Sequence, residues 1–95
     1  METNNTSKHL LIFGRVQGVY YRAWSAQTAE ELGLTGWVRN RRDGSVEASV
    51  IGPCNMVDRF IEACHDGPDK ANVERIDINN GKKEPLVGFE IRKTH

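Results

Sequence analysis

The sequence contains no hydrophobic run long enough to cross a membrane and no excess of charge of either sign. Its longest purely apolar stretch is Leu10 to Phe13, whereas a membrane helix needs about 20 residues. Thirteen basic residues balance thirteen acidic ones, so no global field attracts nucleic acid or an anionic membrane. Met1 to Thr3 lack the basic region of a secretory signal. We therefore expect a cytoplasmic protein with neither a membrane nor a nucleic acid as partner, in which any anion site is local.

Cysteine and histidine are also scarce, and they are not clustered. Cys54 and Cys64 fall within one predicted helix, where ten residues separate their α-carbons by about 15 Å, well beyond the roughly 7 Å that a disulfide allows. The histidines His9, His65 and His95 are dispersed, with no His-x-x-x-His or Cys-x-x-Cys pair. The sequence therefore predicts no disulfide, no metal site and no cofactor.

The start of the chain predicts one strand and one helix within a single domain of 95 residues. Residues 1–7 are polar and aperiodic, so we expect a flexible N-terminus and a domain over residues 8–95. Lys8 to Phe13 has the length of a strand, and its residues Leu10 to Phe13 are apolar on both faces, which favours an interior position in a sheet. From Tyr21 to Leu32, apolar or small residues recur every three or four positions until Gly33, which predicts an amphipathic helix.

Two strand-like segments, 36–42 and 45–51, can pair in two registers. A two-residue turn sets Val38 opposite Ser49, whereas a three-residue turn with Gly44 in a left-handed bulge pairs Val38 with Ala48. The second register is preferred because it gathers the apolar residues on one face, together with Asn40. It places Val38, Val46, Ala48 and Val50 on that face and Trp37, Arg39, Arg41, Glu47 and Ser49 on the other. Arg39 then faces Glu47 across the strands.

A second helix and two more strands complete the pattern. Pro53 suits the first turn of a helix whose apolar stripe continues to Cys64 and which ends at Gly67-Pro68. Segments 73–78 and 87–92 are predicted to be short strands. This order of elements predicts an α+β fold, the ferredoxin-like split βαβ sandwich, with an antiparallel sheet, two helices on one face and an additional C-terminal strand.

The loop of residues 14–20, between the first strand and the first helix, lacks the usual features of a helix start. None of Val19, Tyr20 and Tyr21 has a side chain of the kind that caps the free amide groups there. Arg22 adds a cation to the first turn, where it opposes the helix dipole. A bound phosphate or carboxylate would resolve both anomalies, and the two glycines of the loop would let the backbone bend around it. Ordinary turn glycines are the alternative interpretation.

The predicted topology brings Asn40 toward this loop. The helix and the strands have similar lengths, about 18 and 20 Å, so the second strand starts at the far edge and runs parallel to the first. It thereby returns to the edge where the loop lies, and Asn40 approaches Arg22. The Asn40 amide can position a water molecule but cannot take a proton from it. An ordinary strand-end asparagine near a turn is the alternative.

Two stretches resemble the signatures of one enzyme family. Gly14 to Arg22, GRVQGVYYR, closely resembles G-x-V-Q-G-V-x-F-R, the first signature of the acylphosphatases, with Tyr21 in place of the usual phenylalanine. Gly36 to Glu47, GWVRNRRDGSVE, resembles the second signature, G-[WY]-V-x-N-x-x-D-G-x-V-E. The resemblance extends from about Leu10 to Ile91. The added hydroxyl of Tyr21 must find water or a partner.

The resemblance implies metal-independent hydrolysis of acyl phosphates, which are mixed anhydrides of a carboxylic acid and phosphate, to a carboxylate and inorganic phosphate. Arg22 and the loop amides would hold the phosphoryl oxygens, and Asn40 would orient the attacking water. Phosphate or sulfate would be the product or a competing anion. The implied catalytic residues are Arg22 and Asn40, and the implied phosphate-binding residues are Arg15, Val16, Gln17, Gly18, Val19, Tyr20 and Arg22.

Two other functions compete with this one. An acylphosphatase-like module could bind an anion without turnover, although the presence of both Arg22 and Asn40 favours the enzyme. An RNA-binding sheet is disfavoured by the zero net charge. We expect a monomer, while Leu10 or Ile12 beside Trp37 on the open sheet face would offer a surface for a second copy.

Overall fold

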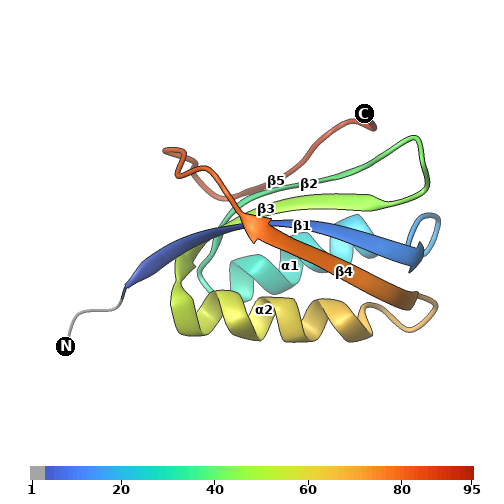
Figure 1. Ribbon diagram of the computed structural model, residues 1–95, viewed down its shortest axis with the longest axis horizontal. Coiled ribbons are helices and arrows are strands. Elements are labelled where there is room, and N and C mark those ends of the chain that lie inside the picture. Colours follow the sequence, from blue (N-terminus) through green and yellow to red (C-terminus); the bar gives the residue numbers. More distant parts are fainter. Residues whose placement is uncertain (1–3) are drawn as a thin grey trace.

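A computed structural model describes residues 4–95 as a five-stranded sheet with two helices packed on one face (Figure 1). The order of the strands across the sheet is β4-β1-β3-β2-β5. This arrangement confirms the predicted α+β, ferredoxin-like fold. The elements in chain order are β1 (Asn5–Arg15), α1 (Tyr21–Glu31), β2 (Thr35–Asn40), β3 (Val46–Pro53), α2 (Cys54–Asp66), β4 (Asn72–Asn80) and β5 (Phe89–Ile91).

The sheet is mixed, which corrects the prediction of a wholly antiparallel one. β5 pairs with β2 in parallel, with Gly36 opposite Phe89 and Val38 opposite Ile91. The cause is the path of segment 81–88, which carries the chain from β4 at one edge to β5 at the other. β4 ends where β2 begins, and the segment stays at that end: the Gly81 N–H donates to the Ser7 carbonyl (2.9 Å) and the Gly36 N–H to the Gly88 carbonyl (3.0 Å). β5 therefore starts beside the start of β2 and runs in the same direction.

β1 begins at Asn5 rather than at the predicted Lys8. Residues 5–7, expected to be flexible, pair with residues 51–53 of β3. β3 extends to Pro53 and so offers main-chain partners to a polar segment whose own sequence shows no strand pattern. Residues 1–3 of the predicted flexible N-terminus lie outside the described residues.

The β2–β3 hairpin has the predicted register. Val38 lies opposite Ala48, and Arg39 lies opposite Glu47. Gly44 takes the left-handed conformation with φ 93°, and the Arg41 N–H donates to the Ser45 carbonyl at 2.9 Å. This register turns the apolar side chains of the hairpin toward the helices, on the same face as Asn40. Val38, Val46, Ala48 and Val50 are all fully buried.

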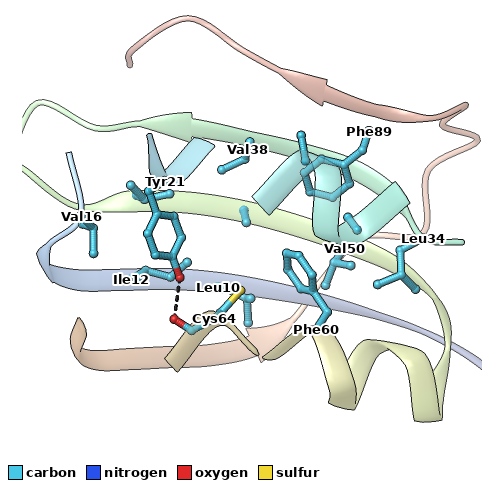
Figure 2. Packing of buried hydrophobic residues seen from close by; sticks show 14 of the residues in the cluster. Leu10, Ile12, Val16, Tyr21, Leu34, Val38, Val50, Phe60, Cys64 and Phe89 are labelled. Carbon is cyan, nitrogen blue, oxygen red and sulfur yellow. Dashed lines mark hydrogen bonds between the residues drawn. The ribbon is translucent and has the colours of Figure 1, made fainter. Parts of the chain in front are cut away.

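Leu10 and Ile12 also face the helices, which corrects the suggestion that one of them lies on the open face. Leu10 pairs with Ala48 and Ile12 with Val46, so they share the buried side of the sheet with these residues. They are part of the core shown in Figure 2. None of the helices formed by residues 4–95 has the length and apolar character needed to span a membrane.

Tyr21 links the start of α1 to the end of α2 through a buried hydrogen bond. Its hydroxyl donates to the Cys64 carbonyl at 2.6 Å (Figure 2). In a continuing helix this carbonyl would accept from residue 68, but Pro68 has no N–H. Burial raises the pKa of Tyr21 far above its usual value, so the hydroxyl remains a donor. The extra hydroxyl therefore has a partner, and that partner would otherwise lack a helical donor.

On the open face, Glu47 holds two neighbours on adjacent strands. His9 Nε2 and Arg39 Nε each lie 2.6 Å from a Glu47 carboxylate oxygen. The guanidinium groups of Arg39 and Arg92 each lie 4.8 Å from the centre of the Trp37 ring. Partial burial by itself would raise the pKa of Glu47, but the hydrogen bonds from Arg39 and His9, with the Arg39 charge, bring it below its usual value. Glu47 therefore favours the folded state when it is ionised.

We expect Tyr21→Phe to lower the free energy of unfolding by about 1–2 kcal/mol, because the buried Cys64 carbonyl then loses its donor. Urea unfolding followed by circular dichroism measures this change. Tyr20→Phe is the matched control, since the Tyr20 side chain is 83% exposed. Equal stabilities of the two variants would contradict the role given to the Tyr21 hydroxyl.

Acid should weaken the fold partly through Glu47. Its pKa is lower in the folded state than the unfolded value of about 4.3, so its stabilisation is present above that value and is lost as the pH falls through the folded pKa. Glu47→Gln should therefore show a shallower fall of unfolding free energy below about pH 5 than the wild type. Glu90→Gln, in a more exposed pair with Arg92 at 3.3 Å, should match the wild-type slope, and the same slope in all three proteins would refute the assignment.

Candidate active site

A cavity of about 470 Å³ lies where the loop after β1, the start of α1 and the end of β2 meet. It brings Arg22 and Asn40 to one place, as the predicted topology requires. The β5 strand closes a further side through Ile91. The lining residues are Val16, Gly18, Tyr20, Tyr21, Arg22, Ala23, Asn40 and Ile91.

The backbone at the start of α1 is bent into an unusual conformation. Tyr20, at the N-cap, has φ 64° and ψ 24°, in the left-handed region that residues other than glycine rarely adopt. Within the described part of the chain, no side chain caps this end of the helix, and its first turn contains no acidic residue. Such a conformation costs about 1–3 kcal/mol and persists only where the surroundings enforce it. The first amide groups of α1 are left to a ligand or to water.

Arg22 adds a free positive charge to this helix start. Its side chain is half-buried, and the ion pairs found within residues 4–95 involve other basic residues, namely His9, Arg39, Arg75 and Arg92. A guanidinium without a carboxylate partner, beside the positive end of a helix, favours an anion with several oxygens.

Asn40 reaches the cavity because it ends β2 on the helix-facing side. Its main chain pairs with Val46 of β3, and its side chain is half-buried. The residues that line the cavity include no histidine and no carboxylate. The hydroxyl of Tyr21 is no substitute for a base, because it is already bonded to Cys64 and burial raises its pKa. Chemistry at this site must therefore rely on positioning and charge.

Three of the residues predicted to bind phosphate do not line the cavity. Arg15 ends β1 and is exposed. Val19 is 3% exposed and belongs to the core. The Gln17 side chain turns to the β2–β3 turn, where Nε2 donates to the carbonyls of Arg41 (2.7 Å) and Ser45 (2.8 Å). Val16, Gly18, Tyr20 and Arg22 do line it.

Gln17 and Val19 nevertheless shape the site. Gln17 ties the loop to the turn that follows Asn40, and Val16 and Val19 anchor the loop in the core. The sequence analysis missed Tyr21, Ala23 and Ile91 as lining residues. Ala23 follows Arg22 on the first turn of α1, so the helical pattern could have indicated it. Ile91 reaches the site only through the parallel pairing of β5 with β2.

The described residues form no evident metal-binding site. Within residues 4–95 no group of three or more histidine, cysteine, aspartate or glutamate side chains is arranged to hold an ion. The two cysteines are free, with Cys54 exposed and Cys64 buried. Burial raises the pKa of the Cys64 thiol to about 12, so it stays protonated and unreactive.

Comparison with known proteins gives a consistent result. The family model named Acylphosphatase matches residues 8–91. An acylphosphatase of Azorhizobium caulinodans is 51% identical over 90% of this chain and 94% of its own, and one of Haloarcula marismortui is 44% identical over 93% and 97%. The structure of an acylphosphatase from Coxiella burnetii superposes with a TM-score of 0.90 at 35% identity and covers 94% of each chain.

Both signature segments lie at the cavity, and the matches extend over nearly the whole length of the chain and of its relatives. The chain therefore belongs to the acylphosphatase family, enzymes that hydrolyse acyl phosphates.

Proposed function

We propose that Arg22 and the main-chain amides of residues 16–22 hold the phosphoryl group of an acyl phosphate, while Asn40 orients the water that attacks phosphorus. The observation that carries this proposal is the single cavity shared by an uncapped helix start, an unpaired guanidinium and a strand-end amide. Each supplies a different need of the reaction.

Arg22 and the amides act on charge. The phosphoryl group carries negative charge on its equatorial oxygens, and donors already fixed in place lower the energy of the transition state without reorganising. Arg22 can donate to two oxygens at once. The loop is fixed before substrate arrives because Gln17 and the two buried valines hold it.

Asn40 acts on the nucleophile. Its side-chain oxygen can accept a hydrogen bond from water and thus aim the water oxygen at phosphorus. As the new P–O bond forms, the bond from phosphorus to the acyl oxygen breaks and a carboxylate leaves. The proton of the water passes to a phosphoryl oxygen of the substrate, so no protein base is required. Because a carboxylate is a good leaving group, we propose that the reaction needs no metal.

Inorganic phosphate, the product, fits the same donors and should compete with substrate, as should sulfate. We also propose that the reaction takes place in the cytoplasm. Both cysteines are free, as is usual in a reducing compartment. Fractionation of the source cells tests this location.

Arg22→Ala and Asn40→Ala should each lower kcat/KM for benzoyl phosphate by at least about 100-fold, measured with EDTA present. The two variants should differ in their inhibition by inorganic phosphate. Arg22→Ala should raise the inhibition constant of phosphate because it removes an anion ligand, whereas Asn40→Ala should leave this constant near the wild-type value. Arg59→Ala, on the exposed surface of α2, controls for the loss of one positive charge.

The assay separates this proposal from the alternatives. Phosphate binding without turnover in the wild type would indicate an anion-binding module. Loss of wild-type activity in EDTA, with recovery on adding a divalent metal, would refute the metal-free mechanism. Full activity of either alanine variant would remove that residue from the mechanism.

We further propose a monomer. The large hydrophobic side chains exposed within residues 4–95 are dispersed, and two of them belong to the cavity. They are Tyr20, Ile78, Val87 and Ile91. On the open sheet face, the Glu47 carboxylate is bonded to the polar side chains of His9 and Arg39. Light scattering after size exclusion should give a molar mass near 10.7 kDa at all concentrations tested, and a concentration-dependent rise toward twice that value would overturn the proposal.

A further inference from the structure

The main chain beyond β5 is bonded directly to the proposed water-orienting residue. The His95 N–H donates to the Asn40 carbonyl at 3.0 Å, and the Arg42 N–H donates to the main-chain oxygen of His95 at 3.1 Å. We propose that His95 is a positioning residue for the reaction, which acts through these two main-chain bonds by fixing the backbone of Asn40. We call this pair of bonds the His95 clamp.

The clamp supplies a partner that β5 does not. The paired residues of β5 end with Ile91 opposite Val38, and the Arg92 N–H then donates to the Val38 carbonyl at 2.8 Å. From there the chain advances from 92 to 95 while β2 advances from 38 to 40, so one extra residue is accommodated as in a β-bulge. The irregular step brings the His95 N–H to the Asn40 carbonyl instead of letting the two segments separate.

With the clamp, consecutive main-chain groups after β2 are held by different elements. The Asn40 carbonyl is held by His95, the Arg41 N–H by the Ser45 carbonyl, and the Arg41 carbonyl by Gln17. The Arg42 N–H returns to His95. Gln17, from the loop after β1, thus holds the Arg41 carbonyl, and His95, from the segment after β5, holds the Asn40 carbonyl and the Arg42 N–H. Asn40, whose side chain must aim a water molecule, immediately precedes this turn, and its own carbonyl is one of the groups that His95 holds.

The consequence for catalysis is a separation between binding and turnover. The direction of the Asn40 side chain follows from the orientation of its backbone, and a small misplacement of a positioning group is costly in rate. Arg22 and the amides of the helix start belong to other elements, and no hydrogen bond within residues 4–95 joins them to the clamp. Loosening the clamp should therefore lower kcat while phosphate binding is preserved.

The clamp uses main-chain atoms only, so the informative comparison is His95→Pro against His95→Ala. Both variants remove the imidazole, but only proline also removes the N–H. We expect kcat for benzoyl phosphate to be on the order of 10-fold lower in His95→Pro than in His95→Ala. KM and the inhibition constant of inorganic phosphate should agree within about twofold between them. A glycine inserted between Lys93 and Thr94, which shifts the His95 N–H out of place without proline, should lower kcat similarly.

The inference rests on the proposed role of Asn40, and the same measurements in the Asn40→Ala background keep the two apart. If His95 acts through Asn40, His95→Pro and His95→Ala should have equal kcat once the Asn40 amide is absent. A further loss in that background would show that His95 acts by another route, such as general destabilisation, and would overturn the inference.

Two other results also have fixed meanings. Equal kcat of His95→Pro and His95→Ala, with Asn40→Ala strongly impaired, refutes the clamp and leaves the proposed function intact. Full activity of Asn40→Ala refutes the role of Asn40 and the clamp together. Thermal unfolding sets the assay temperature below the transition of every variant, and should His95→Pro remain unfolded throughout, the glycine insertion decides the outcome by the same criteria.

Discussion

The register of β2 against β3 is the constraint on which the rest of the structure depends. With Val38 opposite Ala48, the apolar residues of both strands enter the core, and Asn40 points to the same side. A slip by one residue would reverse every side chain of the slipped strand. The same slip would turn Val38 out of the core and Asn40 away from the cavity. Folding and the placement of the proposed water-orienting group are therefore one requirement.

The loop after β1 shows how the fold maintains an unfavourable local conformation. Tyr20 is held in the left-handed region, and within residues 4–95 no side-chain cap offsets the energy of this conformation. The opposing contributions come from outside the loop, through Val16 and Val19 in the core and through the two bonds from Gln17. Immediately after Tyr20, Tyr21 anchors the first turn of α1 to α2. The loop and the start of α1 therefore have their conformation before any anion binds, which is the condition for electrostatic preorganisation.

Local patterns predicted the parts of the fold that depend on local chemistry. The turn at Gly44 and the alternation of apolar residues were sufficient for the β2–β3 register, and the helix start without a cap indicated the cavity. Three failures have a shared cause, because each depends on a partner far along the chain. The polar residues 5–7 become a strand only because β3 is long enough to pair with them. β5 is parallel to β2 only because segment 81–88 stays at one end of the sheet. The hydrogen bonds from the Gln17 side chain to the carbonyls of Arg41 and Ser45 are a third example, because nothing in the sequence around residues 41–45 indicates them.

The same distinction explains how few side chains the site needs. The turn that follows Asn40 is held through carbonyl and N–H groups, which every residue except proline provides. Of the side chains involved, Gln17 reaches across from the loop, while Arg22 and Asn40 face the cavity. The side chains of Arg41 and Arg42 take no part in these main-chain bonds, and that of Arg42 is exposed to solvent. The geometry of the site thus comes mostly from strand pairing, and its chemistry from a very small number of residues placed at the ends of the paired strands.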